Sequence, residues 1–222
     1  MKVTQINDTH FPFQDDECVE TILAHIKLFK PDYVMLCGDI IDMYSMSRFG
    51  KDPKKRILKE ELDMTNEFLD NLQKAMPKKC SAIYMYGNHE KRLEKYIESK
   101  APELDGLLSL AEFLHLEKRG IDYRHYGKWL ELDNVVYMHG EKLGVKSGYA
   151  AHRQMMRVGK TMAMGHTHRL ALVHYTDWRG TYRAVEGGCL CQLDPDYVDG
   201  VADWQHGFVD WIDGVPTLHD FL

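Results

Sequence analysis

The feature that most constrains the fold is the alternation of short apolar runs with longer amphipathic segments in the first half of the chain. Three runs, at 2–7, 32–37 and 81–86, have the length and flanking residues of strands. The segments between them, at 16–29 and 54–75, space their apolar residues as helices do. Connections of this length allow neighbouring strands to run parallel. The first half is therefore predicted to be β-α-β-α-β.

The second half is predicted to be richer in strands. Expected strands span 121–126, 129–132, 135–138, 161–164, 171–175, 181–185, 208–212 and 215–218, and further helices span 90–100, 109–118 and 149–158. Asp133-Asn134 and Asp213-Gly214 match two-residue hairpin turns. The sequence has no internal repeat or flexible linker, so we expect residues 1–222 to form a single α/β domain of two sheets flanked by helices.

Composition narrows the class of protein. With 28 basic and 34 acidic side chains the net charge is −6, which argues against an overall basic surface for nucleic acid but leaves room for a local patch. The apolar runs fall far short of the ~18 residues of a membrane span. The N-terminus is already polar at Thr4, which predicts no signal peptide and a cytoplasmic protein. Five cysteines, an odd number, are expected to be reduced thiols.

Polar side chains gather just after five of the predicted strands. The five motifs are Asp8-Thr9-His10, Gly38-Asp39-Ile40-Ile41-Asp42, Gly87-Asn88-His89-Glu90, His139-Gly140 and Gly165-His166-Thr167-His168. Ligands of open α/β sheets bind outside the carboxyl ends of the strands. We therefore expect three carboxylates, five histidines and one asparagine carboxamide to meet in one crevice.

This set of side chains has the chemistry of a metal site. Imidazole together with carboxylate suits Mn, Fe, Zn, Co or Ni, and the lack of thiolate in the motifs disfavours structural zinc. Seven candidate ligands are too many for one ion, but Asp39 could bridge two. Two divalent ions ~3.5–4 Å apart can clamp both oxygens of an in-line displacement at phosphorus, with a hydroxide between them as the nucleophile.

The five motifs, in this order over positions 8–168, resemble those of the calcineurin-like metallophosphoesterase superfamily. The resemblance implies a four-layer α/β/β/α sandwich of two mixed β-sheets flanked by helices. It also implies two divalent ions, Mn above all, with Fe, Zn, Ni, Co or Mg as alternatives. By motif position, Asp8, His10 and His168 match the ligands of one ion, and Asn88, His139 and His166 match those of the other, with Asp39 as the bridge. His89 matches the histidine that serves the leaving group, and Asp42 matches its carboxylate partner.

Two departures from related enzymes bear on the substrate. Asp42 is followed by Met43-Tyr44, whereas the Ser/Thr protein phosphatases continue with Arg-Gly, so that class is disfavoured. Arg92 keeps an arginine where those enzymes have one and is a candidate to hold phosphate. The segments 186–191 and 204–208 are similar to small metallophosphoesterases of phage and prophage origin, which implies the host cytoplasm as the location.

The substrate itself is the least constrained expectation. Residues 48–56 hold five basic side chains and one acidic one, either as a solvated helix start or as a rim that attracts a polyanion. Arg48 and Tyr44 are the candidate substrate contacts there, and the other interpretation of Tyr44, which its residue type favours, is a packing residue. The leading hypothesis is a phosphoesterase acting on a nucleotide or nucleic-acid phosphodiester. The alternatives are a phosphomonoesterase, a Ser/Thr protein phosphatase, and an inactive scaffold, which would be expected to lack ligands that this chain retains.

The remaining histidines and the clustered cysteines are expected to be structural or solvated. Those histidines are His25, His115, His125, His152, His174, His206 and His219, with His206 the strongest exception because it shares a loop with Trp204. Cys189 and Cys191 are expected to be reduced thiols near the site.

Overall fold

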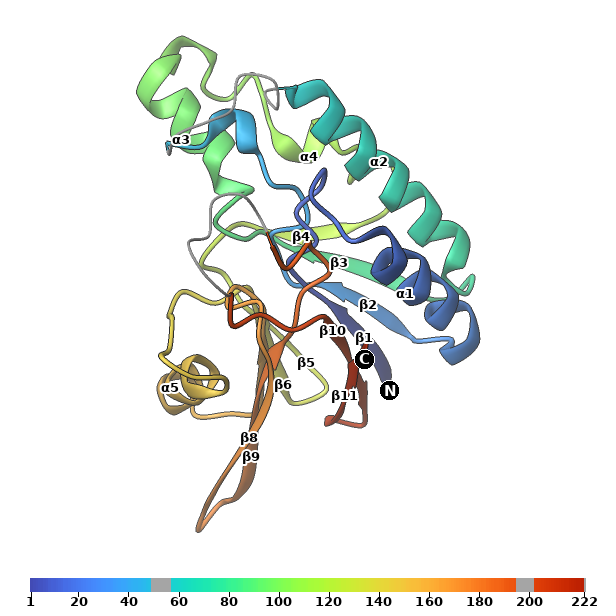
Figure 1. The fold of residues 1–222 in the computed structure, drawn as a ribbon, viewed down its shortest axis with the longest axis vertical. Coiled ribbons are helices and arrows are strands. Elements are labelled where there is room, and N and C mark those ends of the chain that lie inside the picture. Colours follow the sequence, from blue (N-terminus) through green and yellow to red (C-terminus); the bar gives the residue numbers. More distant parts are fainter. Residues whose placement is uncertain (49–56, 195–201, 222) are drawn as a thin grey trace.

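The computed structural model describes residues 1–48, 57–194 and 202–221, and its elements follow the predicted order (Figure 1). Most of the basic segment at 48–56 lies outside the described residues; only Arg48 lies within them. In the part of the chain that the structure describes, no helix has the length and apolar character needed to cross a membrane.

The first sheet is mixed, with strand order β11-β10-β1-β2-β3-β4. Its parallel strands are β1 (Lys2–Ile6), β2 (Tyr33–Leu36), β3 (Ser81–Met85) and β4 (Asp122–Arg124). The C-terminal hairpin of β10 (Gly207–Ile212) and β11 (Val215–Asp220) adds antiparallel strands on the far side of β1. The two ends of the described chain therefore lie in one sheet.

The second sheet is also mixed, with strand order β5-β6-β7-β9-β8. Its strands are β5 (Leu130–Leu132), β6 (Val135–Met138), β7 (Met162–Met164), β8 (Leu170–Asp177) and β9 (Gly180–Gly187). β6, β7 and β9 run parallel, and β5 and β8 are antiparallel to their neighbours. Both predicted hairpin turns are confirmed, since Asp133, Asn134, Asp213 and Gly214 all have positive φ, as type I′ turns require.

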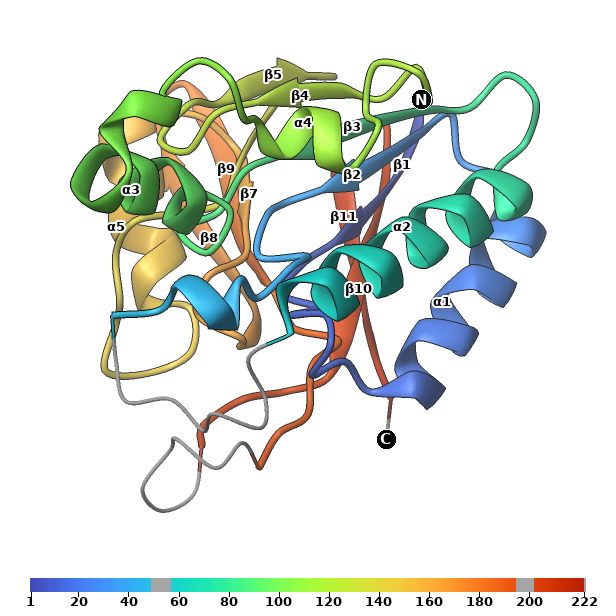
Figure 2. The ribbon, with the colours of Figure 1, turned by 90° about the horizontal axis from the view of Figure 1, so that it is seen from above.

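The helices cover the outer faces of the two sheets. They are α1 (Asp16–Phe29), α2 (Leu58–Ala75), α3 (Lys91–Lys100), α4 (Leu110–Phe113) and α5 (Tyr149–Val158), with 3₁₀ turns η1 (Tyr44–Met46) and η3 (Pro102–Leu104). α1 and α2 lie on one outer side of the molecule and α5 lies on the other (Figures 1 and 2).

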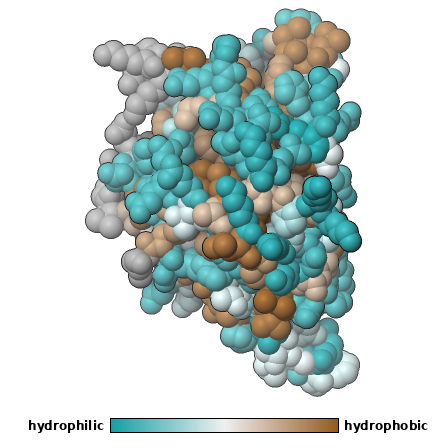
Figure 3. Space-filling view, turned by 90° about the vertical axis from the view of Figure 1, so that its right-hand side faces the viewer, coloured by the Kyte–Doolittle hydropathy of each residue, from teal (hydrophilic) through white to brown (hydrophobic). Residues whose placement is uncertain are grey.

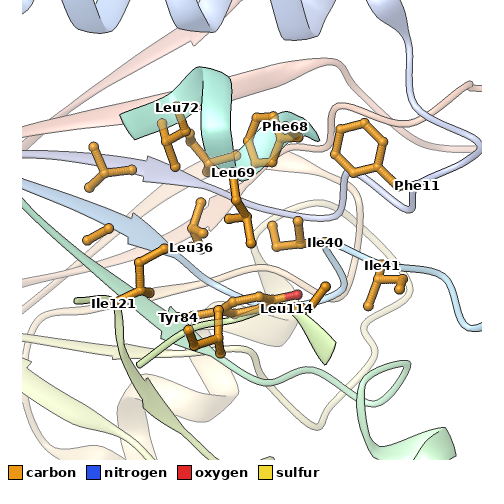
Figure 4. Packing of buried hydrophobic residues seen from close by; sticks show 14 of the residues in the cluster. Phe11, Leu36, Ile40, Ile41, Phe68, Leu69, Leu72, Tyr84, Leu114 and Ile121 are labelled. Carbon is orange, nitrogen blue, oxygen red and sulfur yellow. The ribbon is translucent and has the colours of Figure 1, made fainter. Parts of the chain in front are cut away.

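Three apolar cores hold these layers together. The central core packs residues of both sheets against each other, among them Val3, Met35 and Tyr137. The core under α1 and α2 includes Leu36, and Figure 4 shows Leu69 of α2 close to it. A third core joins α5 to the second sheet. The four-layer α/β/β/α sandwich implied by the resemblance is therefore the observed fold.

The outer helices turn their polar faces to solvent. The face in Figure 3, which includes the side where α1 and α2 lie, is mainly hydrophilic, and its apolar residues form separate patches.

α1 begins after Asp15, whose side chain accepts a hydrogen bond from Cys18 N, and ends at Lys30 in the left-handed conformation.

The helix predicted at 109–118 is wrong in length, because α4 has only four residues. The backbone leaves the helical conformation at Leu114, and His115 has a φ of 52°. Leu114 and Leu116 are both fully buried, so turns satisfy the apolar spacing that suggested a longer helix.

Candidate metal centre

Loops that follow five strands meet at one edge of the sandwich, as predicted. The loops after β1, β2 and β3 come from the first sheet, and those after β6 and β7 come from the second. Backbone hydrogen bonds continue between neighbouring loops, from Asp8 N to Gly38 O at 3.1 Å and from Gly165 N to His139 O at 3.0 Å. The candidate centre therefore lies across the carboxyl ends of the parallel strands of both sheets.

The backbone turns sharply at these residues. Among the described residues, eleven that are not glycine have positive φ, and five of them are candidate ligands: Asp8, His10, Asp39, His166 and His168. This conformation is uncommon outside glycine, although Asp, Asn and His adopt it more readily than most residues. Strained backbone of this kind concentrates at functional sites.

Glycines let the loops approach the carboxylates closely. A Cβ at Gly165 would lie 2.5 Å from Asp8 Oδ2, and a Cβ at Gly87 would overlap Asp39 Oδ1. Gly87 and Gly165 therefore each leave room for a carboxylate of a neighbouring loop.

The first group of donor atoms comes from Asp8, His10 and His168. His10 Nε2 lies 3.1 Å from His168 Nε2, and His168 Nε2 lies 3.3 Å from Asp8 Oδ1. All three residues are buried. The structure therefore brings together the three residues predicted to hold one ion.

The second group comes from Asn88, His139 and His166. His139 Nε2 lies 3.1 Å from Asn88 Oδ1, and the rings of His139 and His166 meet edge-on with centroids 5.1 Å apart. Asn88 and His166 are partly exposed, whereas His139 is buried. The solvent-facing side of the centre is therefore on this half.

Asp39 lies between the two groups. Its Oδ2 is 3.3 Å from His139 Nε2 and 3.9 Å from His10 Nε2. Its Oδ1 accepts a hydrogen bond from His89 N at 2.9 Å. One carboxylate oxygen thus faces both donor groups, which is the position that a bridging ligand needs.

Three of the histidines make outward contacts through Nδ1, while Nε2 faces the centre. His10 Nδ1 lies 2.9 Å from Asp42 Oδ2, His139 Nδ1 lies 2.8 Å from Cys37 O, and His168 Nδ1 lies 3.7 Å from Cys191 Sγ. A hydrogen bond from Nδ1–H leaves the Nε2 lone pair directed inward, and this is how histidine usually ligates a metal. The arrangement of donors therefore fits divalent ions.

His10 and His139 are the two histidines of the centre that carry an added proton and hence a positive charge. Burial alone would raise the pKa of the Asp8 and Asp39 carboxyls, yet the surrounding imidazoles keep both pKa values well below the usual range. Burial would lower the pKa of His139, but Asp39 raises it to about 9. The pKa of His10 is also raised, because Asp42 and Asp8 outweigh burial. A bound divalent ion would replace these protons.

His166 behaves differently. Burial and repulsion from His139 lower its pKa to about 4. Its imidazole is therefore neutral at physiological pH and needs to lose no proton before it can bind an ion.

His89, Asp42 and Arg92 form a connected group beside Asp39. His89 Nδ1 donates to the Asp42 backbone oxygen at 2.9 Å, and the Asp42 carboxylate lies 3.2 Å from the same nitrogen. Arg92 Nη1 donates to both the backbone oxygen and Oδ1 of Asp42, and Arg92 Nη2 lies 3.0 Å from His89 Nε2. Since guanidinium only donates, Nε2 accepts, and His89 is the neutral Nδ1–H form here.

Asp42 therefore does more than the sequence suggested. Its shortest side-chain contact is with His10 Nδ1, and its carboxylate also accepts a hydrogen bond from Arg92 Nη1. Burial would raise the pKa of Asp42, but hydrogen bonds from His10 and His89 hold it below its usual range, so it stays a carboxylate.

Glu90 is a buried residue to which the sequence reasoning gave no role. Its carboxylate accepts four hydrogen bonds: from Asp39 N at 3.0 Å, Ile40 N at 2.9 Å, Gly87 N at 2.7 Å and the Tyr84 hydroxyl at 2.7 Å. It therefore fixes the Gly87 loop to the Asp39 loop. Its place directly after His89 was the available signal, but sequence alone does not show which donors a carboxylate reaches.

Cys191 lies beside the centre, where the sequence placed it without giving it a partner. Cys18, Cys37, Cys80, Cys189 and Cys191 are all free thiols, and the pKa of Cys191 is raised by Cys189 and by burial. Cys191 is thus a neutral thiol against the His168 ring. On another side of that ring lies Trp204, with centroids 4.2 Å apart.

His206 and the predicted substrate contacts lie outside the two donor groups. His206 Nε2 donates to Cys191 O at 2.8 Å, which ties two loops together. Tyr44 begins η1 two residues after Asp42; its ring meets Phe13 edge-on at 5.4 Å, and its N donates to Glu61. Arg48 is exposed just beyond η1.

Comparison with known proteins agrees with this geometry. Residues 1–203 match the family model described as calcineurin-like phosphoesterase. The Gene 54 protein of Mycobacterium phage L5 is 29% identical over 229 residues, which cover 93% of this chain and 87% of that protein. The Gene 54 protein of Mycobacterium phage D29 is 28% identical over 233 residues, with the same coverage. The expected similarity to phage proteins is thus confirmed.

Among solved structures, Vps29 of Chaetomium thermophilum aligns with a TM-score of 0.48 and 11% identity, over 95% of this chain and 83% of that one.

Proposed function

The chain belongs to the calcineurin-like phosphoesterase family, and from that premise we propose that residues 1–222 act as one domain that hydrolyses a nucleotide or nucleic-acid phosphodiester with two divalent ions. Family membership makes the protein a metal-dependent phosphoesterase. The number and identity of the ions, the roles of the residues and the substrate are the proposal.

The observation that carries the proposal of two ions is the place of Asp39. Its Oδ2 faces His10 on one side and His139 on the other. Asp8, His10 and His168 would complete one ion's ligands, and Asn88, His139 and His166 the other's. Imidazole with carboxylate fits Mn²⁺, with Fe, Zn, Ni, Co and Mg as alternatives. Such ions would supply Lewis acidity and lower the pKa of bound water.

His89 is proposed to protonate the leaving group. It can do so only with a proton on Nε2, the atom that now accepts from Arg92 Nη2. A substrate phosphoryl group that binds Arg92 would draw the guanidinium away and free Nε2 to take up a proton from solvent, which it would then give to the leaving group. The Asp42 backbone oxygen and carboxylate would keep Nδ1–H in place and stabilise the imidazolium.

The preference for a diester rests on the basic residues of the segment 48–56. Arg48 is exposed close to the Asp42 loop, and the sequence continues with four more basic residues before 57. Such a group favours a polyanion. Arg92 favours the second candidate, a phosphomonoesterase, because a guanidinium suits the extra charge of a monoester.

A panel of substrates distinguishes the two. The protein is assayed in Mn²⁺, with a chelator control, on bis-p-nitrophenyl phosphate, p-nitrophenyl phosphate, cyclic nucleotides and single-stranded oligonucleotides. Higher kcat/KM on the diesters is expected, and a preference for p-nitrophenyl phosphate would favour the monoesterase. Activity that survives complete removal of metal would contradict the mechanism.

The role of the basic segment has its own test. Replacing Lys51, Lys54, Lys55 and Arg56 with Ala should raise KM for oligonucleotides and flatten its salt dependence. Hydrolysis of bis-p-nitrophenyl phosphate should stay the same. Equal losses on both substrates would mean that the segment supports the fold and does not attract a polyanion.

A further inference from the structure

A second cluster of metal-binding side chains lies away from the candidate centre. It consists of His25 of α1, Asp210 of β10 and His219 of β11, and is called the edge cluster here because β11 is an edge strand of the first sheet. Asp210 Oδ2 lies 2.7 Å from His25 Nε2 and 3.0 Å from His219 Nε2. The sequence suggested structural or solvated roles for both histidines, and it gave no sign that they meet.

Hydrogen bonding explains only part of this arrangement. His25 Nε2 makes a hydrogen bond with Asp210 Oδ2. His219 Nε2 is buried and makes no hydrogen bond with the described residues, although it lies close to the same oxygen. A buried polar atom whose hydrogen bonding is not satisfied calls for an explanation such as a water or an ion. A cation among the three atoms would satisfy them all.

The cluster is held in place by its neighbours. The Phe208 ring stacks on His219 with centroids 4.5 Å apart and 9° between planes, and it lies 4.6 Å from His25. Thr4 Oγ1 donates to Asp210 Oδ1 at 2.7 Å, which leaves Oδ2 directed at the histidines. Support of this kind orients ligands before a metal arrives.

We propose that the edge cluster binds one divalent transition-metal ion, with Zn²⁺ as the best-suited ion. Two imidazoles and one carboxylate form a donor set typical of such ions, with further positions open to water. Asp210 is buried, whereas the His25 and His219 side chains are 23% and 33% exposed, so an ion could enter from solvent. The bound ion would link α1 to the C-terminal hairpin.

The test counts zinc ions and does not depend on the catalytic centre. Tag-free protein is stripped with a chelator and titrated with Zn²⁺ by calorimetry, and tightly bound zinc is measured by mass spectrometry. His25→Ala and His219→Ala should each hold one zinc ion fewer than the wild type, or bind that ion at least about 100-fold more weakly. If an alanine variant fails to fold, Asp210→Asn, which keeps the shape of the side chain, should show the same loss of zinc.

His174→Ala is the matched control, since His174 is an exposed histidine in β8. It should bind as many ions as the wild type. Equal zinc counts in the wild type and the edge-cluster variants would overturn the proposal, and so would an equal loss in His174→Ala, which indicates non-specific binding. Because only differences from the wild type are used, the result stands whether the catalytic centre holds one ion or two.

A second readout separates the two sites. Hydrolysis of bis-p-nitrophenyl phosphate in Mn²⁺ should be unchanged in His219→Ala. A loss of that activity at full catalytic metal content would show that the edge cluster is not an independent site.

Discussion

Glu90→Gln tests whether one buried carboxylate holds the Asp39 and Gly87 loops of the candidate centre together. Oε2 accepts from Asp39 N and Gly87 N, and Oε1 accepts from Ile40 N and the Tyr84 hydroxyl. In glutamine, one of these oxygens becomes an NH₂ group. Placing the NH₂ group at the Oε1 position is less costly. There the Tyr84 hydroxyl can turn to accept a hydrogen bond from the amide, and only Ile40 N–H loses its acceptor.

The size of the effect follows from these bonds. A buried donor left unpaired costs ~1–3 kcal/mol, and each remaining bond weakens by ~1 kcal/mol when its acceptor becomes neutral. Burial disfavours the ionised carboxylate and so raises the pKa of Glu90. Replacing this buried charge with a neutral amide therefore recovers part of the cost. The free energy of unfolding should therefore fall by about 2–4 kcal/mol, which lowers the Tm of a chain this long by about 4–16 °C.

The assay is chemical and thermal unfolding in a chelator, so that loss of metal does not contribute. Glu98→Gln, at an exposed position of α3, is the matched control and should change stability by less than ~0.5 kcal/mol. Tyr84→Phe removes only the hydroxyl and its hydrogen bond to the carboxylate, and should cost about 1.5–3 kcal/mol. If Glu90→Gln is no less stable than Glu98→Gln, the carboxylate does not fix the two loops.

Three further predictions concern the centre itself. Asp39→Asn should abolish turnover and reduce the metal content to one ion or none; turnover with two bound ions would contradict its bridging role. His89→Ala should keep both ions but lose ~10²–10⁴-fold in rate on esters with alkoxide leaving groups, and far less on p-nitrophenyl esters, whose leaving group needs no proton; equal losses would exclude an acid role. Mn²⁺ affinity should rise between pH 6.5 and 8.5, because His139, with its pKa at about 9, must lose a proton to bind an ion; calorimetric titrations that give equal affinities would refute this.

Much of the candidate metal centre could be predicted because its signals are local. Each candidate ligand lies within four residues of the end of an apolar strand, and the helical crossovers make those strands parallel, so their carboxyl ends must share an edge. Thus Asp8, Asp39 and His139 could be assigned to one crevice from their positions alone. The two sheets flanked by helices and the hairpin turn at Asp133-Asn134 follow in the same way from periodicity and turn chemistry, whereas the four-layer arrangement was implied by the family resemblance and the strand order came from the structure.

Helix length in the 109–118 region could not be predicted, because burial of Leu116 is compatible with a helix and with a series of turns. Periodicity records which side chains are buried and leaves the backbone between them open. The tertiary packing around Leu114 decided it.

Contacts between distant segments were decided by the tertiary structure alone. Glu90 reaches the backbone of residues about fifty positions away, and Asp42 divides its carboxylate between His10 and Arg92. His25 and Asp210 are 185 positions apart and meet only because β10 pairs with β1 beneath α1. A sequence states which groups a chain carries, but the partners of a buried polar group depend on which surfaces pack together, and that depends on the whole core at once.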